Sequence, residues 1–473
     1  MVGISAMTRT PVPELLRRAP AVLVGAALLL LCIGAGVSAG NDGFGQATLL
    51  QVAVVLGVLL VGVWLQRFEF FLLAVLVVRP VLDIAKAGGG PAVLSSGVAA
   101  LVVLGVLLWL AAQANAGTLR RVSLLGRVSV LLLAVMTVSG VVSDEPVRSL
   151  LQVARLAAAV AVFLAVEQFA VNDASRRRVL LACYASSLVP LVVGVLQQVA
   201  GSFLKESNGL GRITGTFLHP NAFGFYLVLL LVMGASVYRY LDGRARVLVG
   251  VVLVVGTVEL VLTYSRGSWI SVIAGLVVVG VLQARKILLM LPVGLVLIVV
   301  AAPSVLTRLS DLSQAETING TPGNSFLWRI GHWSEVLAGA RGHEFLGLGP
   351  SASDYLGDEV LPPHNDFVRM YVETGVLGTV VYVAFILAAV AMAVQRFRAV
   401  PTGHLGRGVA VGAIACTIAF VLGSVGGNLI SETVVLLYFF AFLALASSLT
   451  AGDEGSRAPE AGSARTLVRD SGR

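Results

Sequence analysis

Residues 362–378 read Pro-Pro-His-Asn-Asp-Phe-Val-Arg-Met-Tyr-Val-Glu-Thr-Gly-Val-Leu-Gly, and an apolar run continues from there to Gln395. The two prolines keep the approach extended, and Asn365 or Asp366 is a good N-cap, so a helix is expected to begin here. His364 then lies just outside a helix N-terminus, where the positive end of the helix dipole disfavours a charged imidazole. Such a neutral histidine can act as a general base, or it can simply cap the helix or form a hydrogen bond.

The composition is that of a membrane protein. The chain has 473 residues, of which 57% are hydrophobic and 12% charged, and its mean hydropathy is +0.93. A soluble domain has no interior large enough to bury so much apolar surface. Long apolar runs recur along the chain, and they suit helices that cross a bilayer core about 30 Å thick. We therefore expect an all-α fold, a polytopic transmembrane helical bundle, with a single membrane domain over residues 1–450.

The apolar runs predict fourteen spans. They are 20–38, 48–65, 68–85, 96–112, 124–142, 150–170, 179–199, 221–240, 247–264, 268–282, 287–301, 367–395, 408–426 and 431–449. The polar tail over 451–473 is rich in Gly, Ala, Ser and Arg and is expected to be disordered in the cytoplasm.

Basic residues are distributed unevenly between alternate loops. One set of loops carries Arg9, Arg17, Arg18, Arg67, Arg120, Arg121, Arg127, Arg176, Arg177, Arg178, Arg239, Arg244, Arg246, Arg285, Lys286, Arg396, Arg398 and Arg407. The other set carries far fewer, so the positive-inside rule places the first set and both termini in the cytoplasm. The 62-residue loop 302–363 and the segment 200–220 are then extracytoplasmic. Loops of this length are usually functional.

Several classes of partner receive no support from the sequence. The net charge of +8 follows from the membrane topology, so no nucleic-acid partner is indicated. All three cysteines lie in apolar runs, which favours neither a disulfide framework nor a zinc site. There is no nucleotide-binding loop, and we expect no cofactor. Asp354, Asp358 and Glu359 lie near His364 and leave a metal open, although loop carboxylates are more often solvated.

Polar motifs precede three spans whose N-termini are expected at the outer face. They are Gly211-Arg212-Ile213-Thr214-Gly215-Thr216-Phe217-Leu218-His219-Pro220-Asn221, Tyr264-Ser265-Arg266-Gly267-Ser268-Trp269 and Pro363-His364-Asn365-Asp366. Helix N-termini attract phosphate, and the arginine fork matches phosphate oxygens. Arg212 and Arg266 therefore indicate a diphosphate site at the outer leaflet. The alternative is that these arginines only anchor loops at the level of the lipid headgroups.

Other charged residues fall inside predicted spans, where ionisable groups are usually paired or functional. Arg79 with Asp83, and Arg369 with Glu373, are four residues apart and are expected to pair.

Three more arginines are candidates for contact with substrate. Arg148 and Arg155 are seven residues apart with no local acid in view, so they can extend the basic surface inward toward a lipid phosphate. Arg329 in the long loop, next to Trp328, either contacts substrate or packs the loop.

At these motifs the chain resembles the O-antigen ligase and polymerase superfamily of bacterial envelope enzymes. The resemblance is carried by His364-Asn365 followed after nine residues by Gly375-x-x-Gly378, by the Arg212 and Ser265-Arg266-Gly267 motifs, and by Arg79-Pro80-Val81-Leu82-Asp83. It covers roughly residues 205–380. Ligases of this family commonly have twelve spans, so twelve is the alternative to fourteen.

The resemblance implies a metal-independent membrane glycosyltransferase in the bacterial cytoplasmic membrane, with its active site on the extracytoplasmic side. It would move a glycan from a polyprenyl-diphosphate carrier to a hydroxyl of a glycan or lipid acceptor. The diphosphate-binding role carries over to Arg212 and Arg266, and the essential histidine to His364. Further candidate substrate-binding residues are Arg148, Arg155, His219, Asn221, Arg329 and Asn365.

Two other functions stay open on the sequence alone. A polymerase of the same superfamily would use a second lipid-linked repeat unit as its acceptor. A flippase or exporter of lipid-linked oligosaccharide should carry charges along a path through the membrane, whereas the charges here gather at the outer ends of the spans.

Overall fold

The computed structural model describes residues 64, 67–83, 93–202, 204–207, 210–301, 317–318, 321–322, 325–357 and 360–449. The predicted span 20–38, nearly all of 48–65 and the tail 451–473 lie outside the described residues.

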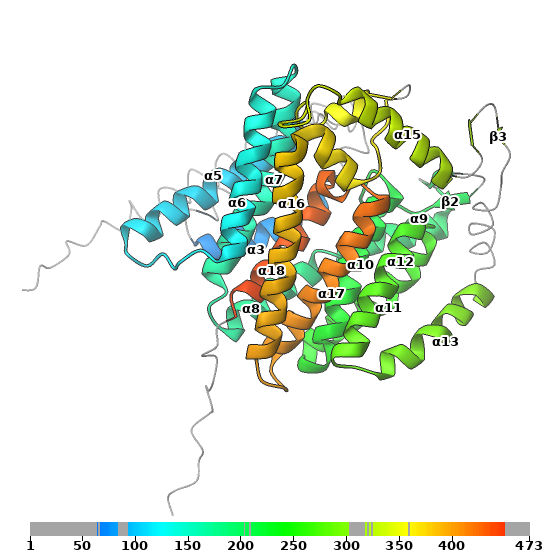
Figure 1. Ribbon diagram of the computed structural model, residues 1–473. Helices are drawn as coiled ribbons and strands as arrows, with labels where there is room; N and C mark the ends of the chain where they lie inside the picture. The colour runs from blue at the N-terminus through cyan, green and yellow to red at the C-terminus, as the bar shows by residue number, and fades with distance from the viewer. Residues whose placement is uncertain are drawn as a thin grey trace, which may run out of the picture.

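Helices make up most of the described chain (Figure 1). The α-helices are α3 (Phe68–Val78), α5 (Val93–Asn115), α6 (Leu124–Val141), α7 (Pro146–Phe169), α8 (Asp173–Ala185), α9 (Leu188–Ala200), α10 (Pro220–Val237), α11 (Gly243–Leu262), α12 (Arg266–Leu282), α13 (Lys286–Ala301), α15 (Ser325–Gly339), α16 (Asp366–Ala399), α17 (Leu405–Gly426) and α18 (Thr433–Ser447). Short 3-10 turns are η1 (Tyr238–Tyr240), η3 (Ala352–Tyr355) and η4 (Leu429–Ser431). The strands form two antiparallel hairpins, β1 (Lys205–Ser207) with β2 (Leu210–Arg212), and β3 (Thr317–Ile318) with β4 (Thr321–Pro322).

The all-α membrane bundle expected from composition is confirmed. Eight helical segments of the described chain, with α8 and α9 counted as one, are long and apolar enough to cross a bilayer, and shorter apolar helices accompany them. Each predicted span from 68–85 onward coincides with a helix or, for 179–199, with the pair α8 and α9, which is interrupted at Ser186–Ser187. The number of crossings and their direction stay predictions.

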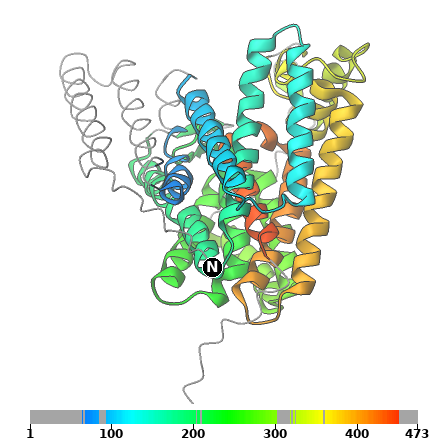
Figure 2. The same cartoon turned by 90° about the vertical axis from the view of Figure 1, so that its left-hand side faces the viewer.

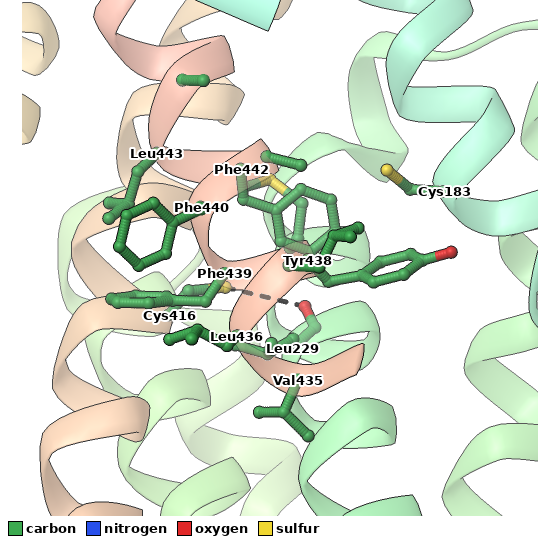
Figure 3. Close-up of a cluster of buried hydrophobic side chains, with 14 of the residues drawn as sticks. Cys183, Leu229, Cys416, Val435, Leu436, Tyr438, Phe439, Phe440, Phe442 and Leu443 are labelled. Carbon is green, nitrogen blue, oxygen red and sulfur yellow. Dashed lines mark hydrogen bonds between the residues drawn. The ribbon is translucent and has the colours of Figure 1, made fainter. Parts of the chain in front are cut away.

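Helix α18 forms the centre of the bundle, and all of its residues are buried. Aromatic rings project from it toward several neighbours (Figure 3). Phe439 stacks on Phe420 of α17 at 4.1 Å between ring centroids, and Phe440 stacks on Phe385 of α16 at 5.1 Å. Tyr438 packs edge-on against Tyr226 of α10. Since the packing of α18 reaches three helices at once, it fixes their relative positions.

Helix α16 is kinked where the sequence predicted a continuous span. Gly375 has φ 65° and ψ −165°, a conformation that only glycine adopts readily. The kink releases backbone groups, and the segment 344–349 supplies their partners: Leu348 N–H donates to Val372 O at 3.0 Å, and Val376 N–H donates to Glu344 O at 2.7 Å. The glycine of the sequence motif is therefore explained by the docking of this loop.

Figures 1 and 2 show the long helices running roughly along one direction, with α16 on the side of the bundle. Helix α15 lies at the end of the bundle where α16 begins (Figure 1). The loop 302–363 thus contains a helix of its own, packed over the start of α16.

Candidate active site

The β1–β2 hairpin delivers Arg212 to the end of the bundle. Arg212 is buried at the end of β2, directly before the segment that leads into α10. Its Nε donates to Thr263 O at 2.7 Å, and one Nη donates to Asn221 Oδ1 at 2.8 Å. These two bonds hold the guanidinium in a fixed orientation between the starts of α10 and α12.

The N-termini of α10 and α12 lie against each other. A Cβ on Gly224 of α10 would lie 2.6 Å from Ser268 Oγ of α12, so only glycine permits this approach. Arg266 is the first residue of α12 and is half-buried. The structure therefore brings the Arg212 and Arg266 motifs together, as expected from the sequence.

His219 is the N-cap of α10. Its Nδ1 accepts a hydrogen bond from the backbone N–H of Asn221 at 3.1 Å. The half-buried ring has a pKa of about 4, because burial disfavours the charged form and the positive charges of Arg212 and Lys205 oppose it further.

His364 has φ 52°, the left-handed conformation that side-chain-bearing residues seldom adopt. Its Nδ1 lies 3.0 Å from Nδ2 of Asn428, in the connection between α17 and η4. Burial lowers the pKa of His364 to about 3, and the positive charges of Arg329 and Arg369 lower it further. The imidazole is therefore neutral near pH 7, and it lies within electrostatic range of His219.

The expected cap at the start of α16 is confirmed. Asn365 Oδ1 accepts from the backbone N–H of Phe367 at 2.9 Å and of Val368 at 3.2 Å. This side chain is engaged with its own helix, so any contact with substrate would have to involve its remaining NH2 group.

Asp366, the next residue, holds a different part of the molecule. Its carboxylate accepts from Ser424 Oγ at 2.7 Å and from Ile430 N–H at 3.3 Å. It thereby fastens the start of α16 to the end of α17 and to η4, the region that carries Asn428.

Helix α15 contacts the segment that leads to His364. His332 Nε2 lies 3.0 Å from Leu361 O, and Trp333 Nε1 donates to Pro363 O. Arg329 donates to Gly426 O at 3.0 Å, at the end of α17. Arg329 therefore joins the loop to the bundle and also contributes positive charge beside His364.

Both predicted ion pairs are present. Arg79 Nη1 lies 2.9 Å from Asp83 Oδ1, although α3 ends at Val78 and the pair lies in the turn that follows. Arg369 Nη1 lies 2.8 Å from Glu373 Oε1, and its other Nη contacts Asp354. Asp354 is thus paired with arginine, although its side chain stays partly exposed.

Metal-ligand candidates are not clustered in the described part of the chain. Among the residues that the structure describes, no group of three or more His, Cys, Asp or Glu side chains could hold a metal ion. Asp358 and Glu359 lie outside the described residues.

The view of Arg148 as free of local acids was wrong, whereas the hydrogen-bond partner of Arg155 is an amide. Arg148 is exposed, lies 3.2 Å from Glu145, and has its guanidinium carbon 4.1 Å from the centre of the Tyr355 ring. Arg155 donates to Gln152 Oε1 at 2.7 Å, and Glu432 is the charged residue that acts on it most strongly. Glu145 is only three residues from Arg148, so the sequence itself contained this signal.

Sequence reasoning missed Asn428 completely. It lies 64 residues beyond His364, in the turn Gly426-Gly427-Asn428 between two apolar runs. A polar residue that follows two glycines and precedes an apolar segment is typical of an ordinary turn. Only the fold brings it to the histidine ring.

The fold and this arrangement define a class: a polytopic membrane protein with a polar site that combines arginines, helix N-termini and neutral histidines. Comparison with known families identifies it more closely. A family model described as O-Antigen ligase matches residues 250–383, from α11 into α16. The match includes Arg266, Arg329 and His364, and Arg212 precedes it. No curated protein matches the chain. Over these residues, which are less than half of the chain, the protein is similar to the O-antigen ligase family, whose members are glycosyltransferase-like membrane enzymes of polysaccharide biosynthesis.

Proposed function

We propose that this protein transfers a glycan from a polyprenyl-diphosphate carrier to an acceptor hydroxyl at the outer face of the bacterial cytoplasmic membrane, as a ligase. One observation carries the proposal: Arg212, fixed at the junction of two helix N-termini, lies close to His219, which in turn lies close to His364. Both histidines stay neutral at pH 7. The leaving group in such a reaction is anionic, and the acceptor hydroxyl has to lose a proton. The two halves of the site match these two needs.

Arg212 and Arg266 bind the donor diphosphate in this proposal. Arg212 is held by Thr263 O and Asn221 Oδ1, so little side-chain entropy is lost when a phosphate binds. The N-termini of α10 and α12 add the partial positive charge of their helix dipoles. Asn221 has a supporting role, since it orients the guanidinium.

His364 is the general base. Its Nδ1 is occupied by Asn428, so Nε2 is the ring nitrogen that can meet the acceptor. The base needs the proton on Nδ1 and the lone pair on Nε2, with the amide oxygen of Asn428 as the acceptor for Nδ1–H. In the orientation that the structure has, Asn428 Nδ2 faces His364 Nδ1, and Asn428 Oδ1 is buried with no hydrogen-bond partner among the described residues. Rotating the amide by 180° gives that oxygen a partner.

The chemical step follows from these assignments. The acceptor oxygen attacks the anomeric carbon, its proton moves to His364 Nε2, and the electron pair of the breaking C–O bond passes to the diphosphate. Positive charge from the arginines stabilises the developing negative charge. A diphosphate is a weakly basic leaving group, so it needs charge stabilisation more than protonation. No step in this scheme uses a nucleotide or a metal.

The remaining candidate residues surround this centre. Arg329 bridges α15 and α17 and contributes positive charge beside His364. Arg155 and Arg148 of α7 are assigned to contacts with the acceptor or with lipid headgroups. The loop 302–363 lies on the extracytoplasmic side of the membrane in this proposal, and both termini are cytoplasmic.

Reconstitution tests the function directly. The purified protein in liposomes is supplied with a polyprenyl-diphosphate-linked oligosaccharide and a fluorescent acceptor, without nucleotide. We expect glycan on the acceptor together with release of polyprenyl diphosphate. Lipid-linked chains of increasing length without an acceptor would instead identify a polymerase. Movement of the intact donor across the bilayer without transfer would contradict the proposal.

A further inference from the structure

His219 shares the site with His364, but its hydrogen bonding differs. The partner of His219 Nδ1 is a backbone N–H, that of Asn221 at 3.1 Å, and a backbone N–H can only donate. Nδ1 must therefore carry the lone pair, and in the neutral ring the proton is on Nε2. The bond is part of the N-cap of α10, so it persists as long as the helix start is intact.

The remaining nitrogen of His219 is therefore a donor. Among the residues that the structure describes, Nε2–H has no hydrogen-bond partner. The half-buried ring is not a freely solvated donor. An acceptor atom of the substrate can therefore take up this N–H.

The charges around His219 determine which acceptor fits. The groups that act on it are Arg212 and Lys205, both positive, and His364 lies within electrostatic range and is neutral. A neutral N–H donor beside two cations is suited to an anion. The ring itself stays neutral at pH 7, because burial and these charges keep its pKa at about 4.

We propose that His219 is a neutral hydrogen-bond donor to the diphosphate of the lipid carrier and not a base. The inference rests on the proposed function, which supplies the diphosphate. It divides the labour between the histidines: His219 Nε2–H contacts a phosphate oxygen and keeps its proton throughout, while His364 Nε2 takes the proton of the acceptor. Negative charge grows on the diphosphate as the C–O bond breaks, so the hydrogen bond from His219 strengthens in the transition state.

Two substitutions separate the roles of the two ring nitrogens. In His219→Asn the amide oxygen replaces Nδ1 and preserves the cap, because asparagine is a favoured N-cap residue, but the distal donor is lost. In His219→Gln the amide NH2 replaces Nε2–H and the cap is weakened. Glutamine can donate a hydrogen bond but cannot accept a proton at pH 7.

The probe is farnesyl diphosphate, with farnesol as the uncharged control, and binding is measured by calorimetry in detergent micelles. A hydrogen bond to a charged group typically contributes enough that its loss weakens binding about tenfold or more. We expect His219→Asn to lose about tenfold in affinity for farnesyl diphosphate and His219→Gln to lose about threefold, with farnesol unaffected. Transfer by His219→Gln should fall in proportion to its binding.

Each contrary result has a distinct meaning. If His219→Asn binds farnesyl diphosphate as tightly as the wild type, the histidine is only a cap and the inference fails. If His219→Gln binds well yet transfers as slowly as His364→Gln, then His219 exchanges a proton and the inference also fails. If the wild type binds no farnesyl diphosphate, both this inference and the proposed function fall. Full transfer by His364→Gln would remove the proposed base and leave the role of His219 intact.

Discussion

Replacing Gly375 by alanine is expected to destabilise the protein strongly. At φ 65° and ψ −165° an alanine is strained by about 1–3 kcal/mol. Its Cβ would lie 2.3 Å from the carbonyl carbon and oxygen of Phe345 and 2.6 Å from Glu344 O, so the docked loop has to move. Displacing packed atoms costs about another 1–3 kcal/mol. The free energy of unfolding should therefore fall by about 2–6 kcal/mol.

The assay is reversible unfolding in mixed micelles by titration with sodium dodecyl sulfate, followed by circular dichroism. The matched control is Gly331→Ala in α15, where a Cβ would meet no atom within 4 Å. That change should be neutral or stabilise by about 0.5–1 kcal/mol, since alanine favours the helix. A Gly375→Ala protein as stable as the wild type would refute the kink and the docked loop.

Three further predictions concern the site and its orientation. The transfer rate should be constant between about pH 5 and 8 and should fall as the pH approaches the pKa of His364, about 3. Because bound diphosphate is anionic, it should raise the pKa of His364, so the acid limb of kcat should lie at higher pH than the acid limb of kcat/KM. Arg212→Ala and Arg266→Ala should each weaken farnesyl diphosphate binding, with lysine at these positions intermediate; unchanged binding in both alanine variants would make them headgroup anchors. In a cysteine-free background, Ser334→Cys at an exposed position of α15 should react with an impermeant thiol reagent on intact spheroplasts, whereas Thr402→Cys, also at an exposed position, should react only after lysis. The reverse pattern would mean that the protein has the opposite orientation in the membrane.

The same histidines make stability depend on pH. The folded protein keeps His219 and His364 neutral down to pKa values of about 4 and about 3, whereas the unfolded chain takes up these protons near 6.5. Below about pH 6.5 the unfolded state therefore binds more protons, and the free energy of unfolding falls as the pH is lowered. The stabilisation that comes from keeping both histidines neutral is therefore fully present at pH 8.

The helices could be predicted well from the sequence because membrane helices consist of long apolar runs. Each of the later spans, from 68–85 to 431–449, coincides with helical structure. The caps were also local signals: Asn365 lies at the predicted start of α16 and bonds as expected. The two ion pairs at a spacing of four residues, such as Arg369 with Glu373, followed from helix geometry.

Features that depend on distant parts of the chain were not predictable. The kink at Gly375 is stabilised by hydrogen bonds from the segment 344–349. No local sequence pattern predicts that this segment packs against α16. Glu259 was overlooked inside an apolar run, although it is buried in α11 against Gly194 of α9.

The central position of α18 could not be read from its composition either. All residues of α18 are buried within the protein, whereas much of α11, which is also strongly apolar, is exposed on the surface of the bundle. Apolar side chains suit both environments equally, so hydropathy does not distinguish them.

The central claim is that His364 takes the proton of the acceptor. The most direct test compares single-turnover glycan transfer by the wild type and His364→Ala, after both have been shown to fold and to bind farnesyl diphosphate equally. The control is His404→Ala, an exposed histidine at the start of α17 whose side chain forms no cap. Loss of a general base lowers rates by about 10²–10⁴, so transfer by His364→Ala should be at least about a hundredfold slower while His404→Ala is unaffected. A folded, donor-binding His364→Ala protein that transfers glycan at a rate near that of the wild type would contradict the account.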